Sequence, residues 1–181
     1  MALLFKNYQL FLPKKRMDKK LQILNAEQVQ MKLNRIAYEI VENNIETKEI
    51  VLAGIRETGV VLADILKHHI EKISTIKVSV IVININKKNP IECNIESDFD
   101  PKGKNIIIVD DVADSGKTMM YALRPFLHTI PKGVQVAVLV DRKHKKFPIT
   151  SDYIGLQLST TVQENIRVEC KDNKILGAYI D

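Results

Sequence analysis

Apolar side chains recur every three or four positions in two stretches of the chain, which is the spacing of one helix face. The first stretch covers residues 26–43, and Asn25 followed by Gln28 is typical of a helix start. The second follows a turn bracketed by Gly54 and Gly59. The two stripes consist of Val29, Leu33, Ile36, Ala37, Ile40 and Val41, and of Leu62, Ile65, Leu66, His69, Ile70 and Ile73. This pattern predicts two amphipathic helices packed on a sheet.

Four short apolar runs with little alternation lie between and after these helices. They read EIVLAGI, KVSVIVI, NIIIVDD and VQVAVLVD, at residues 49–55, 77–83, 105–111 and 134–141. Continuous apolar runs are typical of strands that are covered on both faces. Strands that alternate with helices at this spacing indicate an α/β fold with a doubly wound parallel sheet.

Three further segments complete the pattern. The polar stretch from Asn84 to Lys104 contains two prolines and few large apolar residues, which predicts a mobile loop with a short hairpin. Residues 116–129 predict another helix, although Pro125 interrupts its pattern. The tail holds the short strand-like pieces DYIGLQL, NIRVEC and KILGAYI.

The basic charge of the chain is concentrated at its N-terminal end. The formal net charge is +5, and residues 1–20 carry six lysines and arginines against one aspartate, so the remaining body is formally neutral. Residues 1–20 have no long apolar core and no small-residue cleavage site, so we expect neither a signal peptide nor a membrane span. We expect a disordered or loosely docked arm there, with Met17 as an alternative start, followed by one domain at residues 21–181.

The two cysteines, Cys93 and Cys170, are isolated in the sequence. Neither belongs to a C-x-x-C pair or lies near clustered histidines, so disulfide and zinc sites both lack support. We therefore expect a cytoplasmic protein that does not associate with membranes.

The stretch IIIVDDVADSGKT, residues 106–118, carries the candidate chemistry. Asp110 and Asp111 follow a buried strand, and ligands of parallel sheets bind at the carboxyl ends of strands. Small residues and free amide groups at the start of the next helix are suited to a phosphate group. The donors of this turn are the backbone at Ser115 and Gly116, the hydroxyls of Ser115 and Thr118, and the ammonium of Lys117. We therefore expect an anion site beside two carboxylates.

A nucleoside-triphosphate P-loop is excluded, because that motif requires a glycine where this chain has Asp111. Two carboxylates instead suit the vicinal hydroxyls of a ribose, with a divalent cation nearby. A sugar with a phosphate at one end matches the whole stretch. The alternative interpretation is an acidic loop that only caps the following helix.

At this point the chain resembles a known family, because IIIVDDVADSGKT is similar to the phosphoribosyl-diphosphate signature of type I phosphoribosyltransferases. The resemblance implies a Rossmann-like fold with a mostly parallel sheet flanked by helices, a small hood and a mobile loop. It also implies Mg2+-bound phosphoribosyl diphosphate as a substrate, with Asp110 and Asp111 at the ribose hydroxyls and near the metal. The implied binding residues are Asp110, Asp111, Val112, Ala113, Asp114, Ser115, Gly116, Lys117 and Thr118.

Three longer stretches are similar to bacterial pyrimidine-operon attenuation regulators that are also uracil phosphoribosyltransferases. They are LNAEQVQMKLNRIAYEIVENN, IVLAGIRETGVVLA and VQVAVLVDRKHKKFPITSDYIG. The resemblance implies a homodimer or larger homo-oligomer and a diphosphate-binding loop. This loop consists of Arg56, Glu57, Thr58 and Gly59, with a cis peptide bond expected between Arg56 and Glu57.

The base that accepts the phosphoribosyl group stays open between two possibilities. The regulators usually have an aromatic residue at the position of Asp114, whereas 6-oxopurine enzymes have an acid there that handles a ring-nitrogen proton. Asp141 and Arg142, however, lie where those purine enzymes use a lysine. We take uracil as the leading acceptor and a 6-oxopurine as the alternative. Asp114 joins Asp110 and Asp111 as a candidate catalytic residue, and the candidate base-binding residues are Asp141, Arg142, Tyr153 and Ile154.

Two other features bear on function. The mobile loop lacks the tyrosine and arginine of the uracil enzymes, and Lys87 and Lys88 replace them only as point charges. A basic cluster after the last core strand is the candidate contact for a messenger-RNA leader, and it contains Arg142, Lys143, His144, Lys145 and Lys146. A weakly catalytic or non-catalytic nucleotide sensor that binds RNA and regulates pyrimidine genes is therefore a third possibility.

Overall fold

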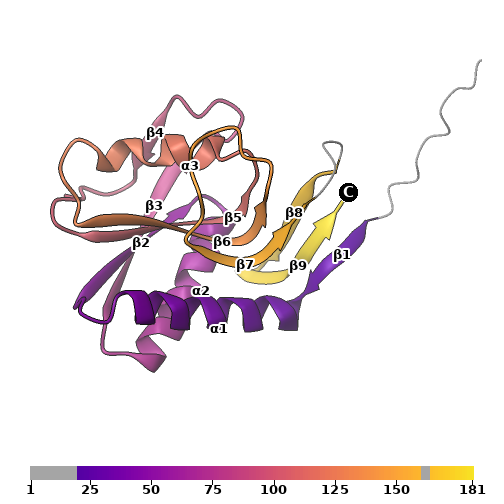
Figure 1. Cartoon of the computed structure of the whole chain (residues 1–181), viewed down its shortest axis with the longest axis horizontal. Helices are drawn as coiled ribbons and strands as arrows, with labels where there is room; N and C mark the ends of the chain where they lie inside the picture. Colours follow the sequence, from indigo (N-terminus) through magenta and orange to yellow (C-terminus); the bar gives the residue numbers. More distant parts are fainter. Residues whose placement is uncertain (1–19, 160–163) are drawn as a thin grey trace, which may run out of the picture.

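The computed structural model describes residues 20–159 and 164–181, so all but the last residue of the predicted N-terminal arm lies outside the described residues. A six-stranded sheet forms the centre, with strand order β4-β3-β2-β5-β6-β7 (Figure 1). All neighbouring strands are parallel except β4, which pairs antiparallel with β3. The strands are β2 (Glu49–Ile55), β3 (Lys77–Ile85), β4 (Cys93–Ile95), β5 (Asn105–Ala113), β6 (Gly133–Arg142) and β7 (Tyr153–Leu158).

Helices cover both faces of this sheet (Figure 1). Helices α1 (Ala26–Asn43) and α2 (Thr58–Ile73) pack on one face, and α3 (Lys117–Ala122) with the short 3-10 helix η1 (Arg124–Phe126) packs on the other. Alternate residues of β5 point to opposite faces, so Ile107 contacts the α1 and α2 side while Ile108 contacts the α3 side. This double burial explains why the strands are apolar at nearly every position.

The two predicted long helices are confirmed. Helix α1 begins with a reciprocal cap, in which the Gln28 amide N–H donates to Asn25 Oδ1 at 2.8 Å and the Asn25 amide N–H donates to Gln28 Oε1 at 2.9 Å. The side chains of its predicted stripe from Val29 to Ile40 are buried. The cap and the stripe together fix both the start of the helix and the face that it buries.

One of two further segments differs from the sequence expectation. The predicted helix at residues 116–129 is wrong in its length, because α3 ends at Ala122 and η1 ends at Phe126. Pro125 has no amide hydrogen and cannot continue the α-helical hydrogen bonds, so the chain tightens into a 3-10 turn there. The polar stretch from Asn84 to Lys104 does contain the expected short hairpin, since β4 folds back on β3.

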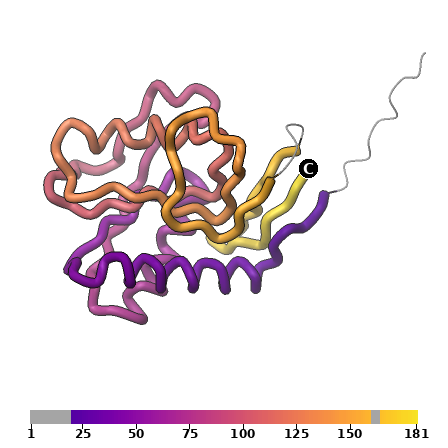
Figure 2. The backbone as a smooth tube through the Cα atoms, viewed as in Figure 1, coloured from indigo at the N-terminus to yellow at the C-terminus, as the bar shows by residue number. Residues whose placement is uncertain are grey.

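A second, three-stranded antiparallel sheet completes the molecule, with order β1-β9-β8. It consists of β1 (Leu21–Asn25), β8 (Ile166–Lys171) and β9 (Lys174–Ile180). Figure 2 shows the first described strand lying beside the last one, so the two ends of the described chain meet in this sheet. The sequence did not mark β1 as a strand. Among the described residues, no helix is both long enough and apolar enough to cross a membrane.

Candidate active site

Two adjacent carboxylates lie at the carboxyl end of β5, near the middle of the six-stranded sheet. Asp110 has only 1% of its side chain exposed, whereas Asp111 has 16% exposed. Lys87, just beyond the end of β3, donates from Nζ to Asp110 Oδ1 at 2.8 Å and to Asp111 Oδ1 at 3.0 Å. The structure therefore brings the two predicted acids together and adds a lysine from another strand.

Burial determines the electrostatics of this group. Burial raises the pKa of Asp110, the neighbouring charge of Asp111 raises it further, and Lys87 opposes both effects. Burial alone lowers the pKa of Lys87, but its two carboxylate partners outweigh that effect and raise the pKa. Positive charge from Lys87 favours the ionised form of both acids, although one of them is fully buried.

The turn after the acids has the close backbone packing expected of a phosphate loop. Gly116 has a φ of +81°, and a Cβ atom there would lie 3.3 Å from the carbonyl oxygen of Phe147. The amide groups of Lys146 and Phe147 donate to the Ser115 carbonyl at 2.9 and 3.1 Å. A cavity of about 180 Å³ is lined by this turn, and the lining residues are Lys87, Val112, Ala113, Asp114, Ser115, Gly116, Lys117, Thr118 and Met119.

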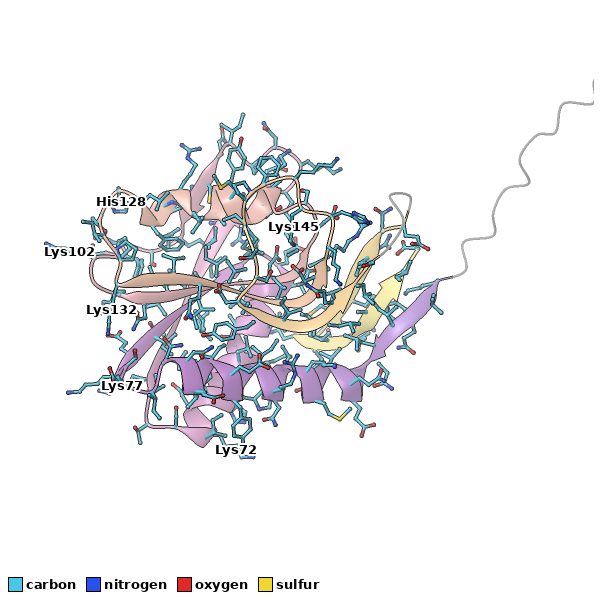
Figure 3. All side chains as sticks on the ribbon, in the orientation of Figure 1. Lys72, Lys77, Lys102, His128, Lys132 and Lys145 are labelled. Atoms are coloured by element: carbon cyan, nitrogen blue, oxygen red, sulfur yellow. The ribbon has the colours of Figure 1, made fainter. Side chains whose placement is uncertain are left out.

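Acidic and basic side chains alternate on the other side of the turn. Arg142, whose side chain is buried, donates from Nη1 to the exposed carboxylate of Asp114, with 3.0 Å between Nη1 and Oδ1. Lys145 Nζ lies 2.7 Å from Asp141 Oδ1 and donates to the carbonyls of Ala113 at 3.1 Å and Asp114 at 3.3 Å. A cavity of about 530 Å³ borders this network. Figure 3 shows Lys145 well apart from Lys77, the first residue of β3, and from Lys132, which directly precedes β6.

These contacts show that some of the residues predicted to bind the base or RNA interact with each other and with the turn after the acids. The ammonium of Lys145 donates a hydrogen bond to the Ala113 carbonyl at the start of the turn, and the Arg142 guanidinium pairs with the Asp114 carboxylate. Lys143, by contrast, is exposed. Arg142 and Lys145 of the predicted RNA cluster thus contribute to the site itself, which their spacing in the sequence did not indicate.

Tyr153 and Ile154 are not brought to this site, so their assignment to the base is corrected. Tyr153 is 1% exposed at the start of β7, and its hydroxyl accepts a hydrogen bond from Asn44 Nδ2 at 3.3 Å. Ile154 packs against the hydrophobic cluster under α3. Besides Lys145, Ser151 Oγ at 2.9 Å and Gln157 Nε2 at 3.5 Å donate to the Asp141 carboxylate. Strand β7 therefore contributes a residue nearer to its carboxyl end than the sequence suggested.

The predicted diphosphate loop connects β2 to α2. The bond between Arg56 and Glu57 is cis, as expected. A Cβ atom on Gly59 would lie 2.5 Å from the Val109 carbonyl oxygen and 3.3 Å from the Asp110 Cα atom, so only glycine allows this loop to approach the acid pair so closely. Thr58 is the first residue of α2, and it adds a hydroxyl to the loop.

Arg56 is held by a residue that the sequence analysis did not single out. Its guanidinium forms an ion pair with Glu96, and Asn84 Nδ2 also donates to Glu96 Oε1 at 3.0 Å. Glu96 and Asn84 belong to the hairpin region of β3 and β4, far from Arg56 in the sequence. No local pattern marks such contacts, because they depend on which strands become neighbours. A larger cavity of about 700 Å³ borders Arg56, but it runs along α2 and does not include the acid pair.

The residues at the acid pair fit the Mg2+ that the resemblance implies. Asp110 Oδ2 is buried and has no hydrogen-bond partner among the described residues. Carboxylate oxygens are the ligands that Mg2+ prefers, and it usually takes its other ligands from substrate phosphates and water. Within residues 20–159 and 164–181 there is no group of three or more side chains that could hold a metal ion.

Comparison with known proteins agrees with this geometry. The family model described as "Phosphoribosyl transferase domain" matches residues 20–173. A protein of Clostridium acetobutylicum named "Bifunctional protein PyrR" is 38% identical over 165 residues, which cover 86% of this chain and 93% of that relative.

Solved structures show the same fold. A hypoxanthine-guanine phosphoribosyltransferase of Bacillus anthracis matches with a TM-score of 0.69 at 25% identity, over 87% of this chain and 97% of that one. A hypoxanthine phosphoribosyltransferase of Trypanosoma cruzi matches with a TM-score of 0.72 at 15% identity, over 88% and 83% of the two chains. The matched family model, the relative and the acid pair with its phosphate loop lead to one conclusion: the chain belongs to the type I phosphoribosyltransferase family.

Proposed function

We propose that the protein transfers the phosphoribosyl group of Mg2+-bound phosphoribosyl diphosphate to uracil, giving uridine monophosphate and diphosphate. The observation that carries this proposal is the acid pair of buried Asp110 and partly buried Asp111 next to a cavity of about 180 Å³ that the following turn lines. A ligand with both sugar hydroxyls and a terminal phosphate would use both halves of this arrangement.

Each part of the site has a role in this reaction. Asp110 and Asp111 accept hydrogen bonds from the ribose hydroxyls, and the turn at residues 114–118 binds the 5′-phosphate. Arg56 and the backbone of its loop bind the diphosphate. A Mg2+ ion held by the acids, the substrate and water would neutralise charge on the leaving diphosphate.

The transfer breaks the bond between ribose C1 and the diphosphate oxygen, and the electron pair leaves with the diphosphate. A bond from uracil N1 to C1 forms as N1 loses its proton. Positive charge develops on the sugar ring meanwhile, and Asp110 and Asp111 favour it electrostatically. Asp114 is our candidate acceptor for the N1 proton, because its exposed carboxylate borders the cavity beside Arg142.

The choice of uracil rests on two observations. The relative named PyrR matches most of the chain, and the stretch after β6 is similar to the pyrimidine-operon regulators. Asp141, where the purine enzymes use a lysine, is engaged by Lys145 and Ser151. Asp114 favours a 6-oxopurine instead, so that base is the alternative acceptor.

The test is release of diphosphate from phosphoribosyl diphosphate and Mg2+, with uracil, guanine, hypoxanthine, xanthine and adenine supplied separately. We expect release with uracil. Release with hypoxanthine or guanine alone would replace uracil by a 6-oxopurine. If no base supports release while the sugar diphosphate still binds, the protein is a nucleotide sensor and the enzymatic proposal fails.

RNA binding is a second candidate function. Two exposed lysines favour it, Lys146 at the 530 Å³ cavity and Lys143 in the same connection after β6. RNA affinity should then fall steeply with salt, because each phosphate contact releases counterions. Replacing Lys143 and Lys146 with glutamine should weaken binding, whereas the same change at Lys77 and Lys132 should not. Weak binding with no salt dependence in the unaltered protein would exclude this function.

We also propose a cytoplasmic homodimer or larger homo-oligomer, as the family resemblance implies. Cys93 and Cys170 are both free, in agreement with a reducing compartment. The outer face of α1 presents Met31 and Tyr38, 59% and 55% exposed, which supplies apolar area to a second copy. Sedimentation equilibrium tests this directly, and a monomer at all concentrations would contradict it.

A further inference from the structure

Lys87 lies where the proposed substrate has to bind. Its ammonium group is within hydrogen-bond distance of Oδ1 of both Asp110 and Asp111, at 2.8 and 3.0 Å. Strand order places β2 between β3 and β5, so the lysine reaches over the end of β2 to arrive there. Ribose hydroxyls and a cation would approach the same two carboxylates, and the lysine occupies one oxygen of each. The lysine and the substrate therefore compete for this position.

The segment that carries Lys87 is attached to the opposite side of the site. Lys117 Nζ donates to the Lys88 carbonyl at 3.4 Å, and Arg124 Nη1 donates to the Ile91 carbonyl at 2.5 Å. Within the segment, Asn86 Oδ1 accepts from the amide groups of Lys88 and Asn89 at 3.0 and 3.3 Å. Residues 86–91 therefore form a strap from β3 to the region of α3 and η1, and Lys87 is its contact with the acids.

The charges explain why this arrangement is stable in the absence of substrate. Asp110 is fully buried, so an unpaired carboxylate there would be costly. Lys87 supplies the required positive charge, and 42% of its side chain stays exposed. This exposure gives the lysine a route back to solvent when another cation takes its place.

We propose that Lys87 is a built-in competitor of the substrate, which occupies the acid pair in the free protein and is displaced when Mg2+-phosphoribosyl diphosphate binds. This inference rests on the proposed function, since it assumes that the acids bind the ribose. Because the lysine must first be displaced, the apparent dissociation constant of the substrate equals the intrinsic constant divided by the fraction of molecules in which the acids are free. Substrate binding also breaks the contact of Lys87 with the acids, so substrate occupancy and the position of residues 86–91 are coupled.

The first test is isothermal titration of Mg2+-phosphoribosyl diphosphate, without any base, into the unaltered protein and the Lys87→Met variant. Methionine keeps an unbranched side chain of similar length but removes the charge. We expect about tenfold tighter binding by the variant, as for a competent state populated at about one tenth. Lys77→Met, at the first residue of β3 and so at the other end of that strand from the Lys87 segment, is the matched control and should bind as the unaltered protein does.

Equal or weaker binding by Lys87→Met would overturn the competitor role and leave the proposed function standing. Absence of binding by both proteins would overturn the proposed function, and the competitor role with it. The two failures are thus distinguishable from one titration series.

A second measurement uses the unaltered protein, so it does not depend on whether the Lys87→Met variant folds. Lysine ammonium groups held in ion pairs exchange their protons slowly and give resolved NMR signals, whereas solvated ones do not. We expect a Lys87 ammonium signal in the free protein and its loss or displacement when Mg2+-phosphoribosyl diphosphate is saturating. A signal that persists unchanged, or that is absent from the free protein, would overturn the proposal.

Discussion

The burial of Asp110 follows from its position at the end of the continuous buried run of strand β5. Its side chain is 1% exposed, and one of its oxygens has no hydrogen-bond partner among the described residues. Such a group binds strongly to any donor or cation that fits, because water does not compete for it. In the function that we propose, this residue would favour a ligand that brings both hydroxyl groups and positive charge.

Asp114 provides a prediction at this scale. Replacing it with asparagine keeps the size of the side chain but removes the proton acceptor, so kcat with uracil should fall by about a hundredfold or more. The dissociation constant of phosphoribosyl diphosphate should change by less than about twofold, because the ribose acids and the phosphate turn are intact. Steady-state kinetics and equilibrium binding check this. Equal losses in turnover and binding would contradict a role in proton transfer, and Asp98→Asn on the exposed β4–β5 connection is the control.

Individual site residues were predictable only where they are close together in the sequence. Asp110, Asp111 and Gly116 belong to one motif, and the structure places them together. Lys87 was predicted as a loop charge but not as a partner of the acids, because a contact over 23 residues depends on the strand order. Tyr153 was misassigned because the sequence does not show which end of β7 reaches the site.

At the scale of elements, the site depends on how closely α2 approaches β5. Gly59 contacts the backbone of Val109 directly, so Gly59→Ala should lower the free energy of unfolding by about 1–3 kcal/mol. Gly133→Ala is the matched control, because a Cβ atom there meets nothing closer than 3.6 Å, and it should change stability by less than about 0.5 kcal/mol. Urea denaturation measures both. Equal stability of the two variants would show that the approach is not tight.

The second prediction at this scale concerns Arg56, which the hairpin of β3 and β4 holds through the ion pair with Glu96. Arg56→Met should raise the KM for phosphoribosyl diphosphate by about tenfold or more, because it removes a charged hydrogen-bond donor to the diphosphate. The KM for uracil should stay nearly constant. Arg167→Met on β8 removes an arginine of the small sheet and serves as the control. An unchanged KM for phosphoribosyl diphosphate would remove Arg56 from the diphosphate site.

Helices and strands were predictable where their pattern of apolar residues is long and regular. Helix α1 and strand β5 were predicted correctly because long stripes and continuous apolar runs leave few alternatives. Helix α3 was predicted too long because Pro125 ends the regular hydrogen bonding before the apolar pattern ends. Strand β1 has five residues and is defined by its partner β9, so its own sequence carries little signal.

The whole molecule is closed by the pairing of its first and last described strands (Figure 2). Leu24 of β1 is 3% exposed and belongs to the same hydrophobic cluster as α1 and β9. Leu24→Ala should therefore lower the free energy of unfolding by about 2–5 kcal/mol. Leu21→Ala, at a position that is 61% exposed, should have little effect in the same thermal and urea measurements. If both variants unfold alike, the small sheet does not stabilise the domain.

The fold class followed from the alternation of strands and helices, whereas the small sheet required knowledge of which distant strands pair. This difference matters for function, since Lys87, Glu96 and Gln157 reach the site only through the final arrangement of the sheet. The central conclusion that we propose is that Asp110, Asp111 and the following turn form a site for a sugar that carries a phosphate.

Equilibrium dialysis of radiolabelled phosphoribosyl diphosphate with Mg2+ tests that conclusion most directly, because it does not require the acceptor base or catalysis. The unaltered protein should bind one molecule per site. Asp111→Asn should bind at least about tenfold more weakly, through loss of a charged acceptor for the ribose hydroxyls, and Asp98→Asn should bind normally. Absence of saturable binding by the unaltered protein, or equal binding by Asp111→Asn, would contradict the assignment of this site.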